Sequence, residues 1–211
     1  MDNQPNMIKT EIIEYAIESA IKPDEFIGYN EGWSFVSNLE KVKEQTTSDK
    51  YRGLWPLPGG TNNYIETLFK YLQAVHGGVN TRSKLIEWYL KNFDTVKSEK
   101  IANGYINVPQ NMGLTVSENG KIGLTEEAEK ILQNQDLGLL YDTISNNILA
   151  FDDIVEFMKT TEEAQSQNSI LEYLKENFDI EWSTFAQVNF RLIWLINLGK
   201  IQKNEGGYSL V

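Results

Sequence analysis

The sequence contains no cysteine, only one histidine (His76), and no apolar run near the roughly 20 residues that a membrane-spanning helix needs. The absence of cysteine excludes disulfides, thiol nucleophiles and thiolate metal sites, and it is typical of cytoplasmic proteins. Residues 1–6 are polar and lack the apolar segment of a signal peptide. We therefore expect a cytoplasmic protein with no membrane partner.

Motifs that carry catalysis are missing as well. No Asp or Glu is followed two positions later by Lys, which excludes the commonest metal-dependent nuclease core. There is no Gly-x-x-x-x-Gly-Lys loop for nucleotide phosphates. Adjacent carboxylates such as Asp152 and Asp153 would point about 100° apart on a helix, so they do not make a catalytic pair. We expect no catalytic residue, no metal and no cofactor in this chain.

Basic charge is scarce, and it is unevenly distributed. The formal net charge is −11, which argues against indiscriminate coating of nucleic acid. Residues 1–60 hold six basic and ten acidic side chains, residues 61–135 hold eight of each, and residues 136–211 hold five and twelve. The middle third is therefore the part of the chain that repels a polyanion least.

What the sequence does contain is an internal repeat. Residues 85–94 resemble residues 170–179, and both runs end in Asn-Phe-Asp. Further on, Met112-Gly113 matches Leu198-Gly199, and Leu124 matches Leu210, at nearly the same offset of about 85 residues. Three matches at a nearly constant offset indicate a duplicated unit, and two copies are too few for a solenoid.

In the first copy, apolar periodicity predicts helices over 61–75, from Asn80 or Thr81, and from Ser98 to a stop at Gly113. Asn119-Gly120 predicts a hairpin turn between residues 114–116 and 121–124, and Thr125 is expected to cap another helix. Pro109 should kink or shorten the third helix.

In the second copy, helices are expected over 139–149, 151–159, 169–178 and from Ser183, followed by a hairpin of residues 201–203 and 208–210. Before the repeat, an amphipathic helix is expected over residues 8–17, ended by Pro23, and a second over 34–43. Residues 54–60 read as a stiff connector.

The predicted fold is mostly α with small β-hairpin wings. It is a tandem winged helix preceded by an N-terminal helical segment. The expected divisions are 1–60, a helical segment packing on the first unit, 61–135, the first winged-helix unit, and 136–211, the second.

Residues 101–106, Met112-Gly113-Leu114-Thr115 and 120–128 carry a family resemblance. They resemble the winged-helix units in the DNA-recognition regions of bacterial restriction endonucleases and modification-dependent restriction systems. The match covers about residues 61–211 and is looser in the second copy. It implies double-stranded DNA as the partner, and a nuclease domain or subunit elsewhere.

If the resemblance holds, the third helix of each unit would enter the major groove. The DNA-contacting residues implied in the first copy are Lys97, Ser98, Lys100, Asn103, Asn107, Asn111 and, on the wing, Lys121. Those implied in the second are Ser183, Thr184, Gln187 and Arg191, with Lys200 and Lys203 near the wing. Lysine suits guanine or phosphate, and asparagine can pair with adenine.

Two alternatives stay open. The acidic second copy could bind a basic protein partner or mediate dimerisation without any DNA. The chain could also mimic DNA and block a DNA-binding enzyme, although its acidic residues do not form a regular dense array. The oligomeric state is not fixed by the sequence.

Overall fold

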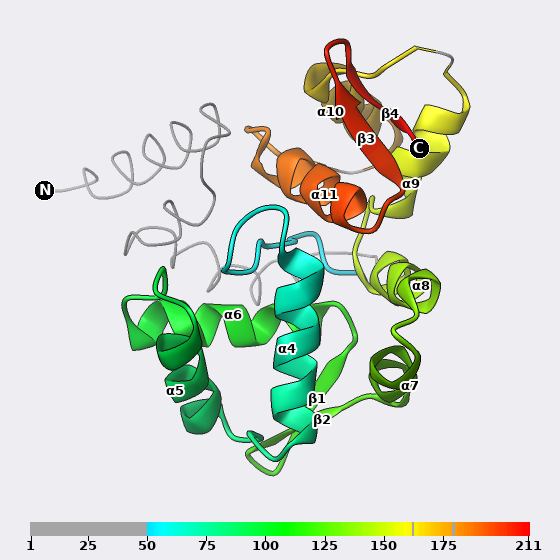
Figure 1. Cartoon of the computed structure of the whole chain (residues 1–211). Helices are drawn as coiled ribbons and strands as arrows, with labels where there is room; N and C mark the ends of the chain where they lie inside the picture. The colour runs from blue at the N-terminus through cyan, green and yellow to red at the C-terminus, as the bar shows by residue number, and fades with distance from the viewer. Residues whose placement is uncertain (1–49, 162, 179) are drawn as a thin grey trace, which may run out of the picture.

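The computed structural model describes residues 50–161, 163–178 and 180–211 (Figure 1). This part of the chain holds eight helices and two antiparallel hairpins. In chain order they are α4 (Tyr64–His76), α5 (Arg82–Asn92), α6 (Glu99–Asn111), β1 (Thr115–Glu118), β2 (Lys121–Leu124), α7 (Glu126–Asn134), α8 (Leu137–Asn147), α9 (Asp152–Lys159), α10 (Gln167–Asn177), α11 (Ala186–Asn197), β3 (Ile201–Asn204) and β4 (Gly207–Leu210). The helices expected over 8–17 and 34–43 lie outside the described residues.

The first unit runs from α4 to β2. Thr81 and Ser98 begin α5 and α6, because each side-chain oxygen accepts the backbone N–H three residues later. Asn119 and Gly120 have φ of 52° and 75°, the left-handed conformation that a tight two-residue hairpin needs. Thr81 also forms an antiparallel bridge to Lys121, which fixes the hairpin against the start of α5.

The second unit runs from α9 to β4 and repeats this order of elements. The extended residue before α10, Gln165, pairs with Tyr208 of β4, as Thr81 before α5 pairs with β2. Two backbone hydrogen bonds, of 2.7 and 2.9 Å, join Gln165 to Tyr208. The order of three helices and a hairpin therefore occurs twice among the described residues.

The helix α11 of the second unit packs against α4 of the first (Figure 1). Its Trp194 packs on Tyr64 of α4, with the ring centroids 5.1 Å apart. Asn197, at the end of α11, accepts a hydrogen bond from the Tyr64 N–H and donates one to the Thr61 carbonyl. The start of α4 is thus capped by a side chain from the other unit, since Asn63 supplies no side-chain cap of its own.

Residues 54–58 of the segment expected to be a stiff connector are buried. Leu54, Trp55 and Leu57 are at most 5% exposed and belong to the core. The Trp55 carbonyl accepts a hydrogen bond from the indole N–H of Trp194 over 2.8 Å. The buried residues of both units form one continuous cluster, and the division expected at 135/136 falls in the turn between α7 and α8.

Two sequence-based details need correction. Pro109 does not shorten the third helix, because α6 continues to Asn111. The helix expected from Ser183 begins only at Ala186. None of the described helices is both long and apolar enough to cross a membrane.

Thr125 is expected to matter for stability, because its hydroxyl makes two bonds. It accepts the Ala128 N–H over 3.2 Å and donates to the Gly113 carbonyl over 2.9 Å. Thr125→Ala should lower the free energy of unfolding by about 1–2 kcal/mol, measured by urea denaturation. Thr125→Ser keeps both bonds and is the control, so equal losses for the two variants would contradict the assignment.

Candidate nucleic-acid interface

The helix α6 has one apolar and one polar face. Ile101, Tyr105, Val108 and Met112 recur at the helical period and are buried. The opposite side carries four polar residues at the same period: Lys100, Asn103, Asn107 and Asn111. Lys100 is exposed and the three asparagines are half-buried. The packed side fixes the orientation of the helix, and the polar side is the less buried of the two.

Arg82, the first residue of α5, lies against two of these asparagines. Its Nη1 donates to Asn103 Oδ1 over 2.5 Å, and its Nη2 donates to Asn107 Oδ1 over 3.0 Å. Asn103 and Asn107 are four residues apart, so their side chains stand one helical turn from each other. One guanidinium therefore orients both carboxamides.

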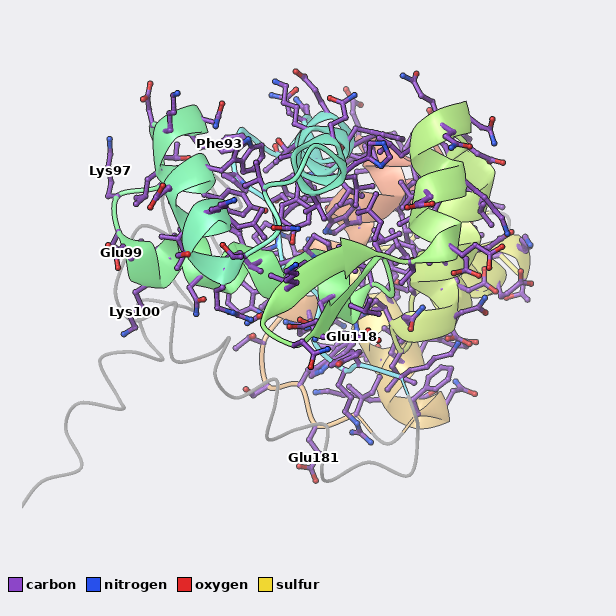
Figure 2. The ribbon with its side chains drawn as sticks, turned by 90° about the horizontal axis from the view of Figure 1, so that it is seen from below. Phe93, Lys97, Glu99, Lys100, Glu118 and Glu181 are labelled. Atoms are coloured by element: carbon purple, nitrogen blue, oxygen red, sulfur yellow. The ribbon has the colours of Figure 1, made fainter. Side chains whose placement is uncertain are left out.

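Three further basic side chains belong to the same unit. Lys84 follows Arg82 on α5, Lys97 precedes α6, and Lys121 begins β2; all three are exposed. Figure 2 shows Lys97, Glu99 and Lys100 projecting from the same end of the molecule. We call Arg82, Lys84, Lys97, Lys100, Asn103, Asn107 and Lys121 the basic face.

Two acidic side chains moderate the charge of the basic face. Glu99 lies between Lys97 and Lys100, and Glu118 faces Lys121 across the hairpin. Tyr71 and Tyr89 beneath are neutral at pH 7, as tyrosines ordinarily are, and burial raises the pKa of both further. The basic face therefore keeps a net positive charge on a chain that is acidic overall.

Two of the residues predicted in the first unit fit the basic face less well. Ser98 is half-buried, and its hydroxyl already accepts the Ile101 N–H over 3.3 Å. Asn111 lies at the far end of α6, about 16 Å from Lys100 at a rise of 1.5 Å per residue. A ligand contacting Lys97 and Lys100 would therefore have to follow the whole helix to reach Asn111.

In the second unit, the prediction of DNA contacts from Gln187 and Arg191 is wrong. They are 4% and 0% exposed, and nine of the twelve residues of α11 are buried. Arg191 donates to the carbonyls of Leu149, Gln187 and Arg52, and to Oε1 of Gln187. The physical reason is that α4 and residues 54–57 cover the side of α11 that looked solvent-facing.

Arg191 is a structural cation. Its guanidinium also lies 4.4 Å from the centre of the Trp182 ring. Burial lowers the pKa of Arg191 to about 9, so the group is still protonated at pH 7. It is stabilised by carbonyl dipoles from three chain segments and has no hydrogen bond left to offer a ligand.

The remaining candidates of the second unit are scattered. Ser183 is exposed, while the Thr184 hydroxyl accepts the Ala186 N–H. Lys200 is half-buried with its Nζ 4.3 Å from the centre of the Tyr141 ring. Lys203 is exposed on β3, where its Nζ lies 5.7 Å from the Tyr208 ring. The structure does not bring these side chains together with a polar helix face.

Sequence reasoning missed Arg82 and Lys84, because only the third helix and the hairpin were searched. A signal was present: the second helix was expected to begin at Asn80 or Thr81, and the residues after a cap form the exposed first turn of a helix. Nothing in the sequence, however, places Arg82 beside Asn103 and Asn107.

Beyond the basic face, the described residues contain an open cleft but no candidate metal cluster. No three of them that could ligate a metal lie together. An open cleft of about 410 Å³ lies against α4 and is lined mainly by Ile65, Phe69 and Leu137. Its two charged residues, Glu66 and Lys70, are paired with each other at 2.6 Å.

The chain was compared with protein-family models, with curated proteins and with solved structures. None of these three comparisons found a match.

Proposed function

We propose that this chain is a tandem winged-helix protein that binds double-stranded DNA through its first unit. In this proposal α6 enters the major groove and the β1–β2 hairpin lies beside it as the wing. The order of three helices and a hairpin supports the fold assignment, as does the bridge of Thr81 to β2. The observation that carries the functional proposal is the polar, basic face of α6 and α5.

The two units have different roles in this proposal. The third helix of the first unit presents a polar face, whereas its counterpart α11 has no exposed residue. The second unit therefore supports the first by packing α11 on α4, and does not read DNA with α11. The resemblance to restriction systems extends the proposal: the chain serves as a recognition part, and cleavage belongs to a separate domain or subunit.

The double variant Lys97→Ala, Lys100→Ala tests the proposal. Each lysine that contacts a phosphate contributes about 0.9 to the slope of log K against log salt concentration. We expect this variant to bind duplex DNA roughly 10- to 100-fold more weakly at 100 mM salt, with a slope smaller by about 2. Fluorescence anisotropy with a labelled duplex measures both.

The matched control is Lys159→Ala, Lys175→Ala, which removes two exposed lysines from the second unit. The control changes the net charge by the same amount. Unaltered DNA binding by the control would show that the position of Lys97 and Lys100, and not the net charge, accounts for their effect. If both double variants weakened DNA binding equally, binding would depend on the net charge of the chain and not on the basic face. No DNA binding by the wild type at any salt concentration would favour the acidic second unit as a docking surface for a basic protein.

A further inference from the structure

In both units, the first residue of the second helix contacts the third helix. In the first unit Arg82, at the start of α5, donates to the amide oxygens of Asn103 and Asn107. In the second unit Gln167, at the start of α10, donates through Nε2 to Oδ1 of Asn189 on α11 over 3.1 Å. Arg82 and Gln167 are 85 positions apart, and Asn103 and Asn189 are 86 apart, the same offsets as in the sequence repeat. The two contacts therefore join equivalent positions of the two units.

The second unit shows what this contact does in the absence of a ligand. Asn189 is only 7% exposed, so its carboxamide does not face solvent. Gln167 Nε2 also lies 3.3 Å from the Tyr208 hydroxyl, so one amide at this position reaches two acceptors. The contact there serves to hold α10 against α11 and to orient one carboxamide. Its counterpart in the first unit is therefore a feature of the fold that exists before any ligand binds.

The first unit extends this contact from one carboxamide to two. Helix α6 has Asn107 at the position where α11 has Ile193. The two branches of the Arg82 guanidinium reach one asparagine each, Nη1 contacting Asn103 and Nη2 contacting Asn107. Both asparagines are half-buried and belong to the basic face. The additional contact thus lies on the side of α6 that the proposed function assigns to DNA.

Holding these side chains in place changes the cost of binding. A side chain that is ordered in advance loses less conformational freedom on binding, which is worth about 2- to 10-fold in affinity for each side chain. One hydrogen bond from Arg82 leaves each amide oxygen a second lone pair, so both asparagines can still donate to and accept from a base edge. The contact fixes where the two amides point and leaves open which base they select.

We infer that Arg82 is a positioning residue, which holds Asn103 and Asn107 in the orientation in which they contact base edges. The inference rests on the proposed function and names the residue on which sequence discrimination by the same face depends. A guanidinium that instead bound a DNA phosphate would contribute to every duplex alike, because phosphate contacts carry no sequence information.

The test compares two affinities of the whole chain by fluorescence anisotropy. One duplex is enriched from a random pool by the wild-type chain, and the other has the same composition in scrambled order. Arg82→Ala should lower the preference for the enriched duplex roughly 10-fold, because two carboxamides lose the group that orients them. Arg82→Gln introduces the residue of the second unit. It should lower the preference by only about 2- to 3-fold, because its amide can still donate to Asn103.

Two controls separate positioning from charge. Lys84→Ala also removes one positive charge from the first turn of α5, but only Arg82 has hydrogen bonds to the asparagines. This control should weaken binding to both duplexes alike and leave the preference unchanged. In a chain that already carries Asn103→Ala and Asn107→Ala, adding Arg82→Ala should cause no further loss of preference, because Arg82 acts through the two amides. Thermal unfolding of each variant verifies that the fold is retained.

The outcomes distinguish the inference from the proposed function. Equal losses from Arg82→Gln and Arg82→Ala, or a further loss in the chain without the two asparagines, would mean that Arg82 itself reads DNA and would overturn the inference. Full preference retained by Arg82→Ala, or a wild-type chain that binds every duplex alike, would also overturn it and leave DNA binding in place. Failure of the wild-type chain to retain any duplex would overturn the proposed function, and the inference with it.

Discussion

Arg191→Met should destabilise the protein by about 2–4 kcal/mol, because it leaves several buried hydrogen-bond acceptors without their donor. Methionine fills a similar volume but donates nothing, so the carbonyls of Leu149 and Arg52 would lose the partner that Arg191 supplies. An unpaired buried carbonyl is itself costly, at about 1–3 kcal/mol. Small domains have a free energy of unfolding of only about 5–15 kcal/mol, so the loss expected for Arg191→Met is a large fraction of the total stability.

Urea denaturation followed by tryptophan fluorescence measures this loss. Arg191→Lys keeps the charge but not the planar fork, so it should still lose a substantial part of the stability. The folded fraction of either variant should bind DNA as the wild type does, because Arg191 lies in the core. A variant with normal stability and weak DNA binding would instead indicate that Arg191 contacts DNA.

Gly207→Ala should be the most damaging small substitution in the second hairpin. Gly207 has φ of 134°, a region that residues with a side chain rarely adopt. A Cβ there would lie 2.5 Å from the Gln165 carbonyl oxygen, which accepts the N–H of Tyr208. Strain together with the lost bridge gives an expected loss of about 2–4 kcal/mol.

The adjacent Gly206 supplies the control for this substitution. A Cβ on Gly206 would meet its nearest atom, the Ala164 methyl, at 3.5 Å, which is ordinary contact. Gly206→Ala should change the free energy of unfolding by less than about 0.5 kcal/mol. If the two alanine variants unfold at the same urea concentration, the close approach of Gly207 to Gln165 is not a constraint on the fold.

Local features of the fold were predictable because their causes are local. Thr125 was predicted as a helix cap, and helix starts were predicted at Asn80 or Thr81 and at Ser98. In the structure Thr81, Ser98 and Thr125 each accept the backbone N–H expected of a cap. The turn at Asn119-Gly120 likewise depends only on which residues tolerate a positive φ. These signals extend over three or four residues, so no tertiary contact was needed to read them.

The role of α11 was not predicted, because it depends on contacts between distant segments. Arg191 and Gln187 look like surface residues when Val188, Leu192 and Leu195 are taken as the only buried face. The other side is covered by α4 and by residues 54–57, more than 100 positions earlier in the chain. One local signal did exist: residues 192–196 are apolar without interruption, and a helix that is apolar all round is buried.

The candidate site was predicted in part. Lys97, Lys100 and Lys121 were named from sequence, and the structure places all three at exposed positions of the first unit. The contact of Arg82 with Asn103 and Asn107 spans 21 and 25 residues and depends on how α5 packs on α6. Sequence periodicity gives the faces of each helix but not the crossing of two helices.

The central claim is that DNA contacts the first unit along α5, α6 and β2, while α11 remains a buried scaffold. The most direct test is a titration of the isotope-labelled chain with duplex DNA, followed by amide chemical shifts in NMR spectra. We expect the largest changes at residues 82–84, 97–107 and 121, and small ones at 186–197. Changes centred on the second unit, or none at saturating DNA, would contradict the account.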